Sequence, residues 1–170
     1  NHRPGPIPAE RVVHILRQMC HSLSEAESCG LVHRDIKPAN VFLCRYGEDH
    51  DFVKLLDFGI AKAVHEPSAE AQTAITMANV IQGTPAFIAP EQAMGKVKDT
   101  GPATDVYALG TILYEMLAGR PPFQSADDGQ ETIPVILDQI RNQEPLPVAR
   151  LVSGLPRDLD TICAKCLHKE

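Results

Sequence analysis

The sequence has no long hydrophobic run and no excess of basic residues. No apolar stretch approaches the roughly 20 residues of a membrane-spanning helix, and the start lacks the charged-then-apolar pattern of a secretory signal. Lysine and arginine total 16 against 22 aspartate and glutamate residues, which gives a formal net charge of -6. We therefore expect no membrane contact from this segment and no surface built to bind nucleic acid.

Cysteines are few and irregularly spaced. The chain has five of them: Cys20, Cys29, Cys44, Cys163 and Cys166. An odd number without regular spacing argues against a disulfide framework and favours a reducing compartment. The "CAKC" pair could suggest zinc, but the second pair that such a site needs is missing. Leu159, Ile162 and Leu167 are predicted to form one apolar helix face around it, so we interpret the thiols as structural.

What the chain does contain is the composition of one globular domain. Its 170 residues are 44% hydrophobic and 22% charged, so disorder, collagen and coiled coil are poor interpretations. No internal repeat, low-complexity block or long linker interrupts it. We expect one compact unit from residue 8 onward.

The hydrophobic pattern predicts a mostly helical fold. The segment 8–30 repeats apolar residues at helical spacing, with proline at its start and glycine at its stop. The segment 103–119 is apolar on nearly every face, as expected of a helix at the centre of a domain. Two weaker helical patterns follow, near 132–142 and 156–168.

A small β-hairpin is predicted beside the helices, which makes the fold class α+β. Two short β-type runs, "VFL" (41–43) and "FVKLL" (52–56), are separated by the polar stretch 44–51. The loop "HRDIKPAN" (33–40) therefore leads into the first strand, and "DFG" (57–59) follows the second.

The loop 33–40 concentrates groups that suit phosphoryl transfer. This reaction needs a carboxylate at the incoming hydroxyl, ligands for Mg²⁺, and cations against the phosphate oxygens. Asp35 can orient or deprotonate the hydroxyl, Lys37 can neutralise phosphate charge, and Asn40 offers an oxygen to a metal. Asp57, after the second predicted strand, supplies the charged metal ligand that the loop lacks.

In sequence order, these motifs resemble a known family. "HRDIKPAN", "DFG" and "APE" (89–91) are similar to the signature set of eukaryotic-type protein kinases, and "GTPAFIAPE" and "DVYALG" extend the likeness. A chance match to the five specified positions of the first motif is on the order of one in a million per start. The resemblance covers residues 1–170 as the C-terminal lobe of a kinase catalytic domain, incomplete at both ends and without the N-terminal lobe.

The resemblance implies a chemical role for each of these residues. Asp35 would be the catalytic base and Lys37 the contact to the transferred phosphate. Asn40 and Asp57 would hold Mg²⁺ or Mn²⁺, and together with Lys37 they would form the ATP-binding part of this lobe.

Five more residues would support the site. His33 and Phe58 would be packing residues, with Phe58 helping to set active against inactive states, and Gly59 would let the backbone turn sharply. Asp105 would brace the backbone of the loop, although an acid at a helix start is also favoured by the helix dipole alone. Glu91 would pair with an arginine beyond this segment, so a buried unpaired carboxylate would cost the segment about 3–5 kcal/mol.

The likeness favours serine and threonine side chains of proteins as phosphate acceptors. Lys37 two residues after Asp35 is the serine/threonine pattern of the family, and "GTPAFIAPEQ" is similar to its bacterial members. Thr84 would contact Asp35 and Lys37 beside the substrate hydroxyl. The alternative for Thr84 is an ordinary turn threonine before proline.

The segment between Asp57 and Glu91 suggests regulation by phosphorylation. A phosphate on it could pair with Arg34, which adjoins the predicted catalytic base. Thr76 is the first candidate for this modification and Thr73 the second, and the alternative is that both are solvated loop threonines. A homodimer for autophosphorylation is left open.

The alternative function is a pseudokinase, a binding or scaffold module that keeps the fold without the activity. The segment contains neither the glycine-rich loop nor the V-A-I-K-type lysine of the family's nucleotide lobe, so the segment alone is expected to be inactive. Pseudokinases commonly lose a group at the positions of Asp35, Asn40 or Asp57, and all three are present. We expect an enzyme in the cytoplasm, with a membrane anchor elsewhere in the full-length protein left open.

Overall fold

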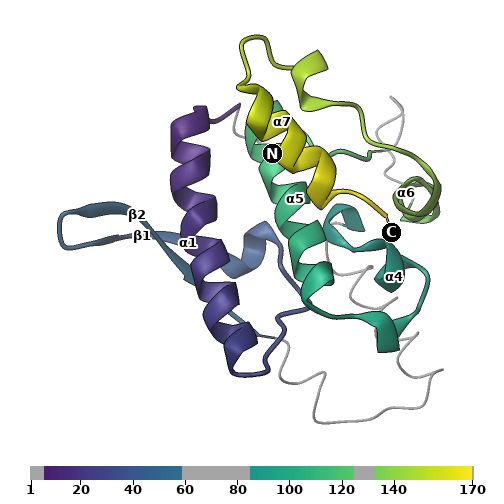
Figure 1. The fold of residues 1–170 in the computed structure, drawn as a ribbon, viewed down its shortest axis with the longest axis horizontal. Helices are drawn as coiled ribbons and strands as arrows, with labels where there is room; N and C mark the ends of the chain where they lie inside the picture. Colours follow the sequence, from purple (N-terminus) through teal and green to yellow (C-terminus); the bar gives the residue numbers. More distant parts are fainter. Residues whose placement is uncertain (1–5, 59–84, 125–132, 170) are drawn as a thin grey trace.

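The computed structural model describes residues 6–58, 85–124 and 133–169, which form a helical body with a β-hairpin beside it (Figure 1). This architecture confirms the predicted class, mostly helical α+β with a small hairpin. The helices are α1 Ala9–Ser28, α4 Pro90–Ala93, α5 Pro102–Ala118, α6 Ile133–Asn142 and α7 Arg157–Cys166, and the strands are β1 Val41–Tyr46 and β2 Asp49–Leu55. Short 3-10 turns cover Pro38–Asn40, Pro85–Phe87, Val97–Asp99 and Val148–Arg150.

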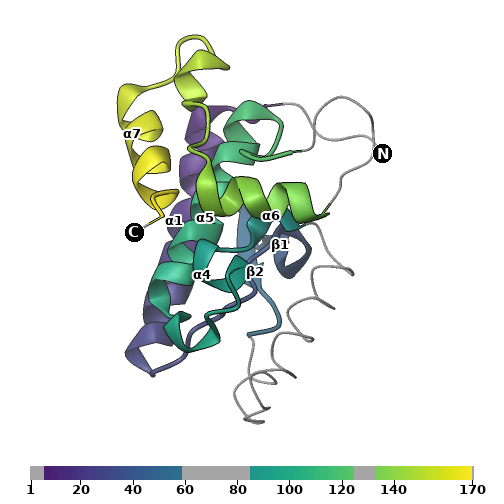
Figure 2. The same ribbon diagram turned by 90° about the vertical axis from the view of Figure 1, so that its right-hand side faces the viewer.

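Helix α5 is the centre of the helical body. It packs against α1 and α7 and is buried along most of its length, as its uniformly apolar sequence predicts (Figure 1). Gly110 allows α7 to approach closely, because a Cβ at this position would lie 2.6 Å from the Cβ of Cys166. Gly119 ends the helix in the left-handed conformation, with φ at 72°. Helix α6 lies across this body beside α4 (Figure 2).

Helix α1 is amphipathic, as its apolar spacing predicts. Val12, Ile15 and Met19 are buried on the side that faces α5 and β2, whereas the opposite side is exposed. Pro8 immediately precedes the helix and Gly30, with φ at 75°, follows it, so the predicted start and stop are confirmed.

The hairpin has a much shorter loop than the sequence suggested. The strands continue through most of 44–51, and only Gly47 and Glu48 remain as the turn, with Gly47 at a φ of 60°. The prediction was wrong because polar residues extend the strands where both faces meet solvent, so no apolar alternation marks them. The aromatic rings of Tyr46 and Phe52 stack across the strands with centroids 5.1 Å apart.

Three side chains fasten the hairpin to α1, and we call them the outer clamp: Arg11, Gln18 and Asp51. The Arg11 guanidinium donates two hydrogen bonds of 2.7 and 2.8 Å to the Asp51 carboxylate. The Gln18 side chain donates to the Asp51 carbonyl at 2.9 Å and accepts from the backbone N–H of Val53 at 3.0 Å. The outer clamp therefore satisfies backbone groups of β2 on the side that β1 does not cover.

The apolar face of α7 also differs from the prediction. Cys163 and Leu167 are buried and Leu159 is partly buried, but Ile162 is 49% exposed. Residues 159, 163 and 167 are spaced four apart and share one side of the helix, whereas residue 162 lies off that side. Burial raises the pKa of the Cys163 thiol to about 12, which keeps it protonated and agrees with a structural role.

Among the described residues, no helix combines the length and the apolar character that crossing a membrane requires.

Candidate active site

The loop 33–40 brings three predicted catalytic side chains together. The turn Pro38–Asn40, closed by a 2.9 Å bond from the Asn40 N–H to the Lys37 carbonyl, folds Asn40 back toward Asp35. The Lys37 ammonium lies 2.9 Å from Oδ2 of Asp35, and Nδ2 of Asn40 donates to the same oxygen at 3.2 Å. Nδ2 of Asn40 also donates to the Asp35 carbonyl at 2.8 Å.

These contacts orient the Asp35 carboxylate while leaving it accessible. The side chains of Asp35 and Lys37 are 30% and 32% exposed, which leaves room for a substrate hydroxyl to approach. Two donors on one carboxylate oxygen fix its plane, so Asp35 can accept a proton from a hydroxyl with a defined direction. Lys37 adds a positive charge beside the position of the reacting group.

The two predicted metal ligands lie on adjacent stretches of backbone. The Leu56 N–H donates to the Asn40 carbonyl at 2.9 Å, and Asp57 is the next residue. Asp57 is exposed and takes a left-handed conformation with φ at 57°, which is uncommon outside glycine. Asn40 uses its NH₂ group on Asp35, so its Oδ1 has no partner among the described residues.

An amide oxygen and a carboxylate are suitable donors for Mg²⁺, which takes one or two protein ligands together with phosphate and water. The described residues contain no cluster of three or more His, Cys, Asp or Glu side chains that could hold a metal. The donor set of Asn40 and Asp57 therefore fits a magnesium ion shared with a nucleotide, and it does not fit a structural zinc site.

His33 connects the loop to the segment that carries Asp57. Its buried ring approaches the Leu56 carbonyl with Nε2 at 2.9 Å, so Nε2 carries the proton. The rings of His33 and Phe58 pack with centroids 4.6 Å apart. These contacts tie residues 56–58 to the start of the loop.

Asp105 holds the backbone of the loop from α5. Its carboxylate accepts hydrogen bonds from the backbone N–H groups of His33 and Arg34, at 2.8 and 2.7 Å. Burial raises the pKa of Asp105 although the two N–H donors act in the opposite direction. Arg34 has a left-handed backbone with φ at 62°, so the site contains two non-glycine residues in this conformation, Arg34 and Asp57.

Gln92, which sequence reasoning assigned no role, contacts the same loop. Its Nε2 donates to the Arg34 carbonyl at 3.0 Å, while its Oε1 accepts from the Ala89 N–H at 3.1 Å. The one available signal was its position three residues after Ala89, where a glutamine can reach back to the start of a helix.

Glu91 differs from the prediction of an unpaired buried carboxylate. The Thr104 hydroxyl donates a hydrogen bond to Oε1 of Glu91, and the side chain is only partly buried. The same hydroxyl accepts from the Gly101 N–H at 3.0 Å, because Thr104 lies in the first turn of α5. The start of α5 therefore provides the partner that the sequence did not suggest.

Four predicted site residues lie outside the described residues: Gly59, Thr73, Thr76 and Thr84. Their expected contacts and modifications stay predictions.

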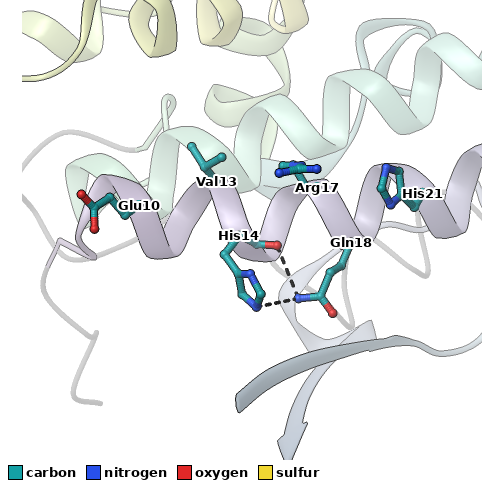
Figure 3. A pocket seen from close by; sticks show the side chains of 6 residues that line it. All are labelled: Glu10, Val13, His14, Arg17, Gln18 and His21. Atoms are coloured by element: carbon teal, nitrogen blue, oxygen red, sulfur yellow. Dashed lines mark hydrogen bonds between the residues drawn. The ribbon is translucent and has the colours of Figure 1, made fainter. Parts of the chain in front are cut away.

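A hollow on the exposed side of α1 contains none of the predicted site residues. Its volume is ≈ 370 Å³. The residues that line it all come from this helix (Figure 3): Glu10, Val13, His14, Arg17, Gln18 and His21. Gln18 points from it toward the hairpin and approaches His14 Nε2 at 3.1 Å (Figure 3). We connect this hollow with the outer clamp and not with catalysis.

Comparisons with known proteins agree with these motifs. A model described as the protein kinase domain matches residues 2–170. Serine/threonine-protein kinase PknB of Mycobacterium leprae is 35% identical over 168 residues, which is 99% of this chain and 24% of that protein. PknB of Mycobacterium tuberculosis (strain H37Rv) is 34% identical over 168 residues, again 99% of this chain and 24% of that protein.

A third relative is serine/threonine-protein kinase Pkn1 of Myxococcus xanthus. It is 41% identical over 165 residues, which is 97% of this chain and 22% of that protein. This chain therefore spans about a quarter of the length of these curated relatives, all of which are bacterial.

Proposed function

Because the chain belongs to the protein kinase domain family, we propose that the full-length protein is a serine/threonine protein kinase. It would transfer the γ-phosphate of Mg-ATP to serine and threonine hydroxyls of proteins. The observation that carries this proposal is the arrangement of Lys37 and Asn40 on the carboxylate of Asp35. The relatives, which are named serine/threonine-protein kinases, support serine and threonine as the acceptors.

The residues of this segment would divide the work of the reaction. Asp35 would accept the hydroxyl proton through the carboxylate oxygens that Lys37 and Asn40 orient. Mg-ATP, when bound, would supply the phosphoryl group and a cation that neutralises its oxygens, with Asn40 and Asp57 as the protein ligands. Lys37 would add the second positive charge beside the transferred group.

Regulation by phosphorylation of Thr76 or Thr73 is part of the proposal. The guanidinium of Arg34 has a buried Nε atom without a partner among the described residues, as expected of a group that pairs with an anion. A phosphate carries up to two negative charges and matches the fork of a guanidinium. Modification by a second copy of the protein would make this a self-activating kinase of the cytoplasm.

The test compares the full-length protein with its Asp35→Asn variant for transfer of radiolabelled phosphate from Mg-ATP to protein. We expect a loss of about a thousandfold in kcat, because the amide cannot take up the proton. Asp99→Asn is the matched control, since this acid is exposed on another turn. Mass spectrometry of residues 62–84 would locate the label on Thr76 or Thr73.

Two outcomes would contradict the proposal. A folded wild-type protein that binds other proteins but transfers no phosphate would be a scaffold of the pseudokinase type. Transfer that survives unchanged in Asp35→Asn would remove Asp35 from the reaction.

A further inference from the structure

Gln92 uses both ends of its side-chain amide, and each end holds a different segment. The Oε1 atom accepts from the Ala89 N–H at the start of α4, and Nε2 donates to the Arg34 carbonyl in the catalytic loop. Gln92 and Arg34 are 58 positions apart in the sequence. The side chain is only partly buried. Capping α4 needs only the bond from the Ala89 N–H to Oε1, so the bond to the Arg34 carbonyl is an additional contact.

The carbonyl that Gln92 holds belongs to the peptide group between Arg34 and Asp35. This peptide follows the left-handed backbone of Arg34, a conformation that non-glycine residues rarely keep without external contacts. Asp105 fixes the N–H groups of His33 and Arg34 on one side. Gln92 fixes the carbonyl on the other side, next to the proposed catalytic base.

A second contact joins the two helix starts that hold this peptide. The Thr104 hydroxyl donates to the Glu91 carboxylate, and these residues are the chain neighbours of Asp105 and Gln92. We call these four side chains the inner network: Asp105, Gln92, Thr104 and Glu91. The inner network forms a closed ring from α4 through the loop backbone to α5 and back to α4.

We propose that Gln92 is a positioning residue for catalysis, because its amide sets the direction of the peptide that carries Asp35. The inference rests on the proposed kinase function and goes beyond it by assigning a role to the residue after the "APE" motif. Gln92 does not touch the reacting atoms, so its loss would lower kcat while the KM for ATP stays close to the wild-type value.

The test uses three variants of the full-length protein in the phosphate-transfer assay. Gln92→Met has a similar shape and removes both hydrogen bonds. Gln92→Glu keeps an acceptor for the Ala89 N–H but loses the donor to the Arg34 carbonyl. Gln143→Glu is the control, because Gln143 is exposed at the end of α6.

We expect kcat to fall about tenfold in Gln92→Met, since one positioning hydrogen bond is lost from the loop. The fall in Gln92→Glu should be larger, because a carboxylate oxygen would face the Arg34 carbonyl oxygen. The KM for ATP should stay within about twofold in both variants. Gln143→Glu should match the wild type.

The outcomes separate this inference from the proposed function. An inactive wild type refutes the kinase proposal and, with it, the positioning role of Gln92. If the wild type is active and Gln92→Glu has the same kcat, the inference is overturned. If Gln92→Met is impaired in that case, Gln92 serves only as the cap of α4. If these variants do not fold, Gln92→Asn replaces them, because its shorter amide cannot span both partners. Wild-type kcat in that variant would also overturn the inference.

Discussion

The inner network and the outer clamp both fix a backbone segment with side-chain hydrogen bonds, but they differ in burial. In the inner network, Asp105 is only 6% exposed, and it accepts hydrogen bonds from backbone N–H groups at the start of the catalytic loop. In the outer clamp, the Arg11 side chain is 49% exposed and solvent reaches the ion pair that it makes with Asp51. The two regions therefore use similar contacts, but we expect these contacts to contribute different amounts to the free energy of unfolding.

The difference shows why a contact list alone does not rank interactions. A buried N–H that loses its acceptor costs about 1–3 kcal/mol, because no water replaces the partner. An exposed ion pair contributes about 0–1 kcal/mol at most, because water and salt screen it. We expect the inner network to determine the geometry of the catalytic loop, and the outer clamp to adjust the position of the hairpin.

The largest effect is expected from breaking the inner network at Asp105. Asp105→Ala leaves the N–H groups of His33 and Arg34 without an acceptor, and the free energy of unfolding should fall by about 3 kcal/mol. Urea unfolding of the catalytic domain measures this change, with Asp99→Ala as the control at an exposed position. A fall below about 1 kcal/mol would mean that the loop does not depend on this carboxylate.

An intermediate effect is expected from the neutral member of the outer clamp. Gln18→Met removes two partly buried bonds to β2 and should lower the free energy of unfolding by about 1 kcal/mol. The same urea experiment applies, with Gln143→Met as the matched change. A loss equal to that of Asp105→Ala would show that burial does not separate the two networks.

The smallest effect is expected from the ion pair of the outer clamp, and it should depend on pH. Arg11 lowers the pKa of the Asp51 carboxyl below its ordinary value of 3.8, so the pair stabilises the folded state above that pH. This stability is lost as the pH falls through the lowered pKa. Asp51→Asn should be slightly less stable than the wild type at pH 7, and this difference should disappear as the pH falls through the lowered pKa of Asp51.

Two controls sharpen this last prediction. Asparagine tolerates the left-handed backbone that Asp51 adopts, at a φ of 56°, so the substitution tests charge and not conformation. Asp49→Asn, at an exposed position of the same hairpin, is the matched control for the substitution itself. A difference at pH 7 that survives high salt would contradict a screened surface pair.

The sequence alone determined the four longer helices and the order of the motifs. Periodic apolar positions predicted α1, and an apolar run on every face predicted the central α5, because burial of these side chains follows from spacing along one helix. The loop 33–40 is also local: Asp35, Lys37 and Asn40 meet through one short turn. Such features depend on residues that are close together in the chain, so the periodicity and spacing of the sequence predict them.

Only the tertiary structure decided which distant groups hold that loop. Gln92 meets the Arg34 carbonyl across 58 positions, and Thr104 gives Glu91 a partner that the sequence did not suggest. The hairpin is likewise held by Gln18, which reaches β2 from another element. Hydrogen bonds of this kind form where packing brings two backbones within about 3 Å of a side chain, and no spacing rule along the chain encodes that meeting.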